Sequence, residues 1–255
     1  MNVLVAAGGT IAPIDDVRRI SNVSSGRFGS MIAEEALRRG AHVWYLHAPT
    51  ALRPFHRLAR FDLDAPDPAA EVRRLVHLRL DWDDVRDRCH FVPLQEGTVE
   101  EYAATLEATL KARPIDVTFL AMAVSDFAPE PIVGKLSSET ETLVLRCHRL
   151  PKVIRSVRDW SPSTYLIGFK LLSDADEGEL IRQARDACAA NRVDLTVAND
   201  LRTVRESRHA IHLVRPEGPV ESFGTDEPIA ERLVDRAFAW ATGRDGLVES
   251  LGPGG

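Results

Sequence analysis

The chain has 255 residues, of which 44% are hydrophobic and 27% charged, and its formal net charge is −6 at pH 7. A chain of this length needs no disulfide scaffold to build a core, and its acidic balance argues against a nucleic-acid partner, which requires a broad basic surface. No run approaches the roughly 20 apolar residues of a membrane span, and the first residues lack the basic start of a signal peptide, so no membrane partner is expected.

The first half of the chain predicts alternating strands and helices. Residues 2–7 form a continuous apolar run, typical of a buried strand, which stops at Gly8, Gly9 and Thr10. A polar loop through Asn22 comes next. The elements expected after it are a helix over 26–40, a strand over 41–46, a part-helical, part-irregular excursion over 49–88, a strand over 89–94, a helix over 98–111 that begins at a threonine N-cap, and a strand over 116–122.

The second half continues the alternation after a polar, proline-containing stretch over residues 127–141. Its expected elements are a short strand over 142–147, a helix over 152–159, a strand over 165–169, a helix over 177–191, a strand over 195–198, an edge hairpin over 210–214 and 219–223, and a closing helix over 228–241. We expect one domain over residues 1–243, with a disordered tail over 244–255.

This alternation predicts an α/β protein with a doubly wound, mostly parallel sheet, a Rossmann-like three-layer fold with an edge β-hairpin and an inserted excursion. Ligands of such sheets bind beyond the carboxyl ends of the strands, where the strand order reverses. The common fingerprints for such ligands are missing from these loops: G-x-G-x-x-G, a tyrosine four residues before a lysine, and G-K-[ST].

Residues 22–29, with the sequence N-V-S-S-G-R-F-G, form a small polar loop that leads into a helix. The amide groups at the helix start, the hydroxyls of Ser24 and Ser25, and the permissive glycines Gly26 and Gly29 could cradle a phosphate. The alternative is that one of the two serines only caps the helix.

Four further residues stand in predicted loops or at strand ends. Asp126 could bind a nucleotide hydroxyl or a metal, or cap a turn. Lys135 could hold a phosphate as a point charge or be a solvated surface lysine. Phe169 could stack on a base or belong to the core, and Asn199 could bind a ligand or only form a turn. The metal ligands stay open.

The order and the amino-acid sequences of these segments resemble the motifs of the phosphopantothenate–cysteine ligase family, whose members are also called phosphopantothenoylcysteine synthetases. The motifs that carry the resemblance cover nearly the whole chain: V-R-R-I-S-N-V-S-S-G-R-F-G at 17–29, A-V-S-D-F at 123–127, G-K-L-S-S at 134–138, L-P-K-V at 150–153, D-W-S-P at 159–162, G-F-K-L at 168–171 and V-A-N-D at 197–200. The resemblance implies a ligase of coenzyme A biosynthesis that joins 4′-phosphopantothenate to cysteine through an acyl-nucleotide intermediate and releases pyrophosphate.

The same resemblance assigns residues. Asn22 matches the family's asparagine at the substrate carboxylate, Arg18 matches a basic position of the same step, and Lys135 joins them as a catalytic residue; Asn199 lies near the substrate. The implied nucleotide site contains Gly8, Gly9, Thr10, Ser24, Gly26, Gly29, Ala123, Val124, Asp126 and Phe169.

The resemblance also implies Mg²⁺, ATP or CTP as co-substrate and a homodimer. Residues 174–194 contain no lysine, unlike the CTP-using enzymes, and the R-P-F-H-R run at 53–57 resembles the stand-alone eukaryotic type, so ATP is favoured and no flavin is expected.

Three cysteines, Cys89, Cys147 and Cys188, form no C-x-x-C pair and are odd in number, which predicts reduced thiols in a cytoplasmic protein and no structural zinc site. Two other functions stay open at this point. One is an NAD(P)-dependent oxidoreductase on a Rossmann-like sheet, and the other is a non-catalytic nucleotide-binding protein.

Overall fold

A computed structural model describes residues 1–136, 141–173, 176–201, 210–224 and 227–243. The strands of its main sheet are, in chain order, β1 (Asn2–Gly9), β4 (His42–His47), β5 (Cys89–Pro93), β6 (Val117–Ala123), β9 (Tyr165–Leu172), β10 (Leu195–Asp200), β11 (Ile211–Val214) and β12 (Glu221–Phe223). Their spatial order is β12-β11-β10-β9-β6-β1-β4-β5. Pairing is parallel from β5 to β10 and antiparallel at β11 and β12, which confirms the expected α/β class with an edge hairpin.

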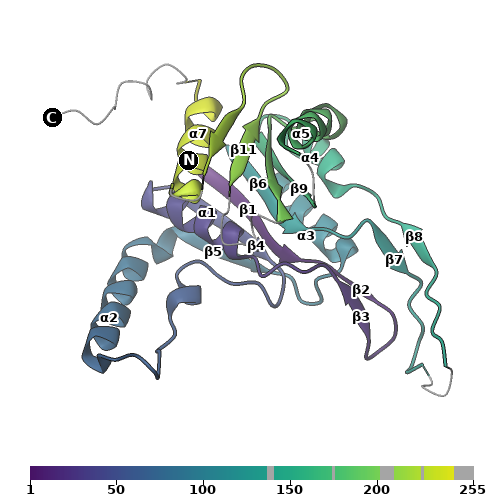
Figure 1. Cartoon of the computed structure of the whole chain (residues 1–255), viewed down its shortest axis with the longest axis horizontal. Coiled ribbons are helices and arrows are strands. Elements are labelled where there is room, and N and C mark those ends of the chain that lie inside the picture. The colour runs from purple at the N-terminus through teal and green to yellow at the C-terminus, as the bar shows by residue number, and fades with distance from the viewer. Residues whose placement is uncertain (137–140, 174–175, 202–209, 225–226, 244–255) are drawn as a thin grey trace.

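Helices cover both faces of this sheet (Figure 1). The helices are α1 (Arg27–Arg38), α2 (Pro68–Val85), α3 (Val99–Ala112), α4 (Val157–Trp160), α5 (Glu177–Asn191) and α7 (Ile229–Ala241), with short 3₁₀ turns η1 (His56–Leu58), η2 (Arg86–Arg88) and η3 (Val153–Ser156). Helices α1 and α7 pack on one face of the sheet, whereas α3, α4 and α5 pack on the other. Two ribbons complete the structure: β2 (Ile11–Pro13) with β3 (Arg19–Ser21), and β7 (Phe127–Pro129) with β8 (Cys147–Arg149).

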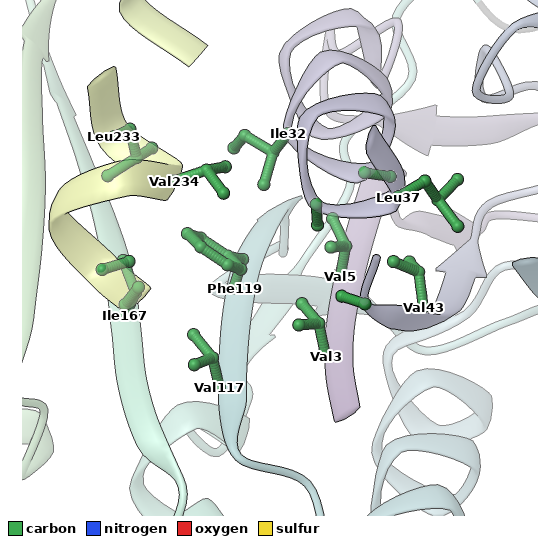
Figure 2. Packing of buried hydrophobic residues seen from close by; sticks show 14 of the residues in the cluster. Val3, Val5, Ile32, Leu37, Val43, Val117, Phe119, Ile167, Leu233 and Val234 are labelled. Atoms are coloured by element: carbon green, nitrogen blue, oxygen red, sulfur yellow. The ribbon is translucent and has the colours of Figure 1, made fainter. Parts of the chain in front are cut away.

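The apolar run of β1 is continuous because both faces of the strand are buried. Val3 and Val5 point toward α1 and α7 and contribute to a core with Ile32 and Val234 (Figure 2). Leu4 and its neighbours on the opposite face pack in the second core under α3 and α4. Each such side chain contributes about 1.5–3 kcal/mol through burial, so the central strand fixes the positions of both helix layers.

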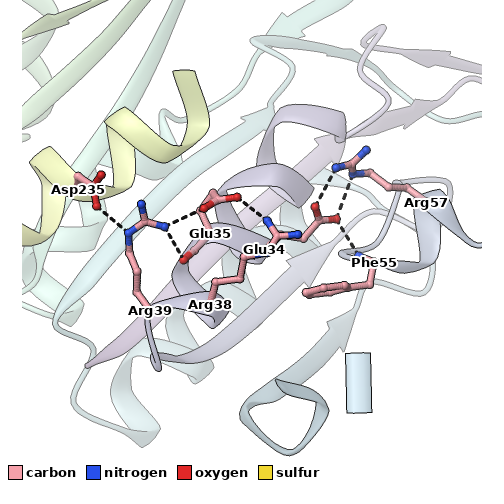
Figure 3. A network of polar contacts seen from close by, with 7 residues as sticks. All are labelled: Glu34, Glu35, Arg38, Arg39, Phe55, Arg57 and Asp235. Carbon is pink, nitrogen blue, oxygen red and sulfur yellow. Dashed lines mark hydrogen bonds and ion pairs between the residues drawn. The ribbon is translucent and has the colours of Figure 1, made fainter. Parts of the chain in front are cut away.

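The excursion between β4 and β5 is held to α1 by a buried carboxylate. Glu34 Oε1 accepts the backbone N–H of Phe55 at 2.7 Å, and its Oε2 pairs with Arg57 Nη2 at 2.8 Å (Figure 3). Phe55 is itself buried and has a positive φ of 58°, which is rare for a residue with a side chain. The predicted mixture of helical and irregular structure is observed here, and this anchor keeps the irregular part in place.

The structure corrects two local predictions. The polar loop expected up to Asn22 contains the β2–β3 ribbon, and the strand expected over 142–147 lies later, at Cys147–Arg149. Each ribbon pairs a partly buried strand with a fully exposed one, β3 or β8, and each strand has only three residues. Such short strands show no apolar alternation in the sequence. The tail over 244–255 lies outside the described residues, and the single domain over 1–243 stays a prediction.

Candidate functional site

The strand order of the main sheet reverses between β1 and β6. The chain moves outward from β1 through β4 to β5, then returns to β6 and moves outward in the other direction through β9 to β10. Loops after β1 and β6 therefore diverge and leave room above the sheet, which is where ligands bind in folds of this type.

A cleft of about 420 Å³ opens at this switch point on the α1 side of the sheet. It is lined by the loop before α1, the first turn of α1 and the ends of β6, β9 and β10. The predicted site residues in its lining are Ser24, Gly26, Gly29, Ala123, Phe169 and Asn199. The ring of Phe169 meets Phe28 of α1 edge-on, with centroids 6.0 Å apart, and offers the cleft an aromatic surface.

The N-terminus of α1 is suited to an anion. Its N-cap is Gly26, which has no side chain that could accept a hydrogen bond from the helix. The first turn of α1 carries no acidic residue. The hydroxyls of Ser24 and Ser25 accept long hydrogen bonds of 3.4 Å from the N–H groups of Gly26 and Arg27. Neither serine is therefore the helix N-cap, and the positive end of the helix dipole faces the cleft.

Close backbone packing explains two of the glycines without any ligand. A Cβ on Gly29 would lie 2.6 Å from Ala7 Cβ, so only glycine lets α1 approach β1 this closely. Gly9 lies against the backbone of Asn22, whose carbonyl oxygen would be 2.4 Å from an added Cβ. These contacts bring the loop that carries Asn22 to the end of β1.

Asn22 is half-buried beside this cleft. Its backbone N–H donates to the carbonyl of Thr10 at 3.2 Å. Its side-chain amide makes no hydrogen bond within the described part of the chain, so it is available to a ligand.

Thr10 has a positioning role. The residue is fully buried, and its hydroxyl accepts the N–H of Ser125 at 2.9 Å while its own N–H donates to the Ala123 carbonyl at 3.0 Å. Thr10 thereby ties the loop after β1 to the loop after β6. Its side chain is fully buried, and its assignment to the nucleotide site stays a prediction.

A second cavity of about 210 Å³ adjoins the cleft and shares Met122 and Phe169 with it. It contains Val124 and Asp126, two predicted nucleotide-site residues that do not line the cleft itself. Asp126 Oδ1 pairs with Lys152 Nζ at 2.5 Å. The end of β6 therefore divides the predicted residues between two neighbouring spaces.

Arg18 and Lys135 lie elsewhere, on the ribbons β2–β3 and β7–β8, which together we call the ribbon pair. Arg18 Nη1 donates to Asp15 Oδ2 at 2.8 Å and to the carbonyl of Leu136 at 3.3 Å. The ribbon pair projects from the sheet (Figure 1), and neither residue lines the cleft or the second cavity.

Asp15 is the polar centre of the ribbon pair. Burial would raise the pKa of its carboxyl, but hydrogen bonds from the N–H groups of Val17, Leu136 and Arg18, with the Arg18 charge, lower this pKa to about 2. Asp15 is therefore ionised at every pH at which the protein works, and it keeps Arg18 turned toward the β7–β8 side.

Membrane-spanning helices and metal-binding clusters are both absent from the described residues. None of the described helices has both the length and the apolar character that a membrane crossing demands. The same residues contain no cluster of three or more His, Cys, Asp or Glu side chains that could hold a metal ion.

Comparison with known families decides the assignment. The model of the family described as "DNA/pantothenate metabolism flavoprotein C-terminal domain" matches residues 1–86 and 92–239 of this chain. The chain belongs to this family. The expected resemblance to the phosphopantothenate–cysteine ligases is thereby confirmed, because relatives with that name match most of the chain.

Two curated relatives and one solved structure are similar to this chain over most of its length. "Phosphopantothenate--cysteine ligase 1" of Oryza sativa subsp. japonica is 31% identical over 79% of this chain and 69% of its own length. "Coenzyme A biosynthesis bifunctional protein CoaBC" of Thermococcus kodakarensis is 32% identical over 91% of this chain. The chain spans about half the length of that archaeal relative. A crystal structure of the DNA/pantothenate metabolism flavoprotein from Streptococcus pneumoniae shares 27% identity, with a TM-score of 0.74 over 94% of this chain and 99% of that one.

The site contains residues that sequence reasoning did not single out. Lys152 and Lys170 line the second cavity, although both stand in motifs typical of the family. A signal was available, because the chain has only four lysines among 32 basic residues. The fold collects two of these four lysines, Lys152 and Lys170, in one place.

Proposed function

We propose that this chain joins 4′-phosphopantothenate to cysteine at the expense of a nucleoside triphosphate, which becomes a nucleoside monophosphate and pyrophosphate. The observation that carries the proposal is the switch-point cleft, where the N-V-S-S-G-R-F-G block forms an uncapped helix start facing an aromatic side chain. Family membership supports it, since relatives named as phosphopantothenate–cysteine ligases align over most of the chain.

The geometry supports a two-step reaction. A carboxylate oxygen of the acid attacks the α-phosphorus, the bond to pyrophosphate breaks, and the amino nitrogen of cysteine then attacks the acyl carbon, loses a proton and displaces the nucleoside monophosphate. The α1 N-terminus would hold the phosphates, Phe169 would pack on the base, and the free amide of Asn22 would donate to the acyl oxygen as charge develops there. No redox chemistry is required.

A direct assay tests this proposal. Folded protein incubated with 4′-phosphopantothenate, cysteine, Mg²⁺ and either ATP or CTP should release pyrophosphate in the first step and the nucleoside monophosphate in a cysteine-dependent second step. No pyrophosphate with either nucleotide would contradict the proposal, and NADPH binding in a fluorescence titration would instead support the oxidoreductase alternative.

Asn22→Ala tests the role of the side-chain amide. Because Asn22 is not tied to other side chains, the variant should fold and bind nucleotide as before, while kcat falls by about a hundredfold or more, the usual cost of losing one donor to a developing oxyanion. In single-turnover kinetics, both the formation of the acyl-nucleotide and the formation of the amide should be slower than in the wild type. Undiminished turnover would remove Asn22 from the mechanism.

We propose ATP as the preferred nucleotide, because the lysines of the CTP-using enzymes are absent from residues 174–194. The cleft fits a Mg²⁺ ion that enters on the triphosphate, since no carboxylate stands among its lining residues and Mg²⁺ commonly binds through phosphates and water. When bound, the ion neutralises charge on the triphosphate. A ratio of kcat/KM for ATP to that for CTP above one is the expected result.

We also propose a homodimer, working in the cytoplasm. Arg18 and Lys135 lie outside the cleft of their own chain, although the family resemblance places both at the reaction. The ribbon pair that carries them exposes apolar side chains, including Val17, Val133 and Val144, as surfaces that bind other proteins do. A second subunit whose cleft receives this ribbon pair would account for both facts. Light scattering after gel filtration should give twice the chain mass.

A further inference from the structure

The excursion reaches the loop before α1 through the backbone of Leu52. The Leu52 N–H donates to the carbonyl of Ser25 at 2.9 Å, and Ser25 stands directly before Gly26, the N-cap of α1. The Leu52 carbonyl in turn accepts the hydroxyl of Tyr45, a residue of β4, at 2.7 Å. Leu52 therefore links the hydroxyl of a core residue to the loop that lines the cleft.

Tyr45 is a permanent donor to this link. Its side chain is fully buried, and its ring packs edge-on against Phe91 with centroids 6.2 Å apart. Burial, together with the charge of the Glu34 carboxylate, raises the pKa of the Tyr45 hydroxyl well above its ordinary value, so the hydroxyl keeps its proton. Tyr45 is not among the lining residues of the cleft or of the second cavity, so any effect on a substrate must pass through Leu52.

The direction of the Ser25 carbonyl decides the direction of the next N–H group. The Ser25–Gly26 peptide is trans, and in a trans peptide the C=O and N–H bonds point to opposite sides. Because this carbonyl points to Leu52, the Gly26 N–H points away from the excursion, toward Ser24 and the cleft. Its hydrogen bond to Ser24 Oγ is long at 3.4 Å, so this N–H can donate to a bound anion.

The glycine makes this peptide easy to turn. Gly26 has a φ of 71°, in the left-handed region, and glycine changes its backbone conformation at little cost. A turned peptide would present the Ser25 carbonyl oxygen to the cleft in place of the N–H, and this oxygen would repel a triphosphate. The hydrogen bond from Leu52 opposes that turn. The Ala51 methyl restricts it further, because it packs so closely that a Cβ on Gly26 would lie 3.0 Å from it.

We propose that Tyr45 is a positioning residue for nucleotide binding: its hydroxyl holds Leu52, and Leu52 fixes the Ser25–Gly26 peptide with its N–H toward the phosphates. This inference rests on the proposed function and adds to it a core residue that touches no substrate. It also gives the excursion a part in the reaction, because its first residues set the direction of a donor at the α1 N-terminus.

Tyr45→Phe tests this role, since it removes the hydroxyl and keeps the ring. KM for the nucleotide should rise about three- to tenfold, the effect of one lost hydrogen bond between uncharged groups, while kcat and the KM values for 4′-phosphopantothenate and cysteine change by less than about twofold. Hydrogen exchange at the Gly26 amide should accelerate, because the peptide turns more freely. An unchanged KM for the nucleotide, or an equal rise for all three substrates, would overturn the proposal.

Thr118→Val is the matched control. Thr118 is fully buried at the start of β6, whereas the cleft opens at the end of that strand, and its hydroxyl is hydrogen-bonded to the Thr164 hydroxyl at 2.8 Å. The variant loses one buried hydrogen bond outside the lining of both spaces, so every KM should stay as in the wild type. A rise in its KM for the nucleotide like that of Tyr45→Phe would show that any loosened core has this effect, which overturns the proposal.

A failure of the proposed function would look different. In that case the wild type releases no pyrophosphate from either nucleotide, and calorimetric titration with inorganic pyrophosphate then tests the positioning role alone. Binding that is about three- to tenfold weaker in Tyr45→Phe than in the wild type and in Thr118→Val supports this role. No binding to the wild type, or equal binding to all three proteins, overturns it.

Discussion

The excursion and the ribbon pair leave the main sheet in different directions (Figure 1) and are held by different forces. The excursion is fixed by the buried carboxylate of Glu34. It accepts a hydrogen bond from the Phe55 N–H and forms a hydrogen-bonded ion pair with the Arg57 guanidinium. The ribbon pair is held by backbone hydrogen bonds, such as Ile132 N–H to the Ile14 carbonyl at 2.9 Å, and by the Asp15 carboxylate.

This difference indicates what each region does. The excursion is anchored to α1, whose N-terminus faces the cleft, so it supports one wall of the cleft. The ribbon pair exposes the side chains of β3 and β8, while Ala128 of β7 packs against the second core. The exposed strands suit a surface that meets a second molecule. Anchoring through a buried charge makes a region essential to the fold, whereas a hydrogen-bonded ribbon can be altered with the core intact.

Glu34→Ala should have the largest effect on stability. The change leaves Arg57 without its partner and the buried Phe55 N–H without an acceptor, which costs about 3–5 kcal/mol. Urea unfolding measures the loss. Arg79→Ala, which breaks an exposed pair with Asp83 on α2, is the control and should lower stability far less than Glu34→Ala, because solvent screens exposed ion pairs. A loss of the same small size in Glu34→Ala would show that the excursion is not anchored by this carboxylate.

Asp15→Asn should affect the ribbon pair and spare the core. The neutral amide holds Arg18 and the N–H groups of Val17 and Leu136 more weakly than the carboxylate does. Hydrogen exchange at these amides should accelerate, while the urea midpoint falls less than in Glu34→Ala. Glu130→Gln, at an exposed position next to β7, serves as the control. Unchanged exchange in Asp15→Asn would contradict the role given to this carboxylate.

The smallest expected effect is a loss of stability that occurs only at acidic pH. The pKa of Asp15 is about 2 in the folded chain, below its ordinary value of 3.8. The unfolded chain therefore binds more protons between these values, so the contribution of Asp15 to stability is complete above about pH 4 and is lost as pH falls through about 2. The amide resonances of Arg18 and Leu136 should titrate with a midpoint near 2. A midpoint near 3.8 would show that the hydrogen bonds to Asp15 do not form in solution.

The sequence predicted best those elements whose ends carry local signals. Helix α5 has the predicted bounds, and its N-cap Asp176 accepts the Glu179 N–H at 2.8 Å. Thr98 likewise caps α3 as predicted. The ribbons escaped prediction because strands of only three residues are too short to show an apolar pattern and have no helix caps.

For the site, the sequence alone established the family motifs and the strand-end loops that carry them, because local composition and order are written along the chain. Tertiary structure decided which of those loops meet. It assigned Ser24 and Phe169 to the cleft, buried Thr10 as a tie between loops, and set Arg18 apart on the ribbon pair. It also collected Lys152 and Lys170 in one cavity, since the convergence of strand ends depends on strand order, which the spacing of residues in one sequence does not encode.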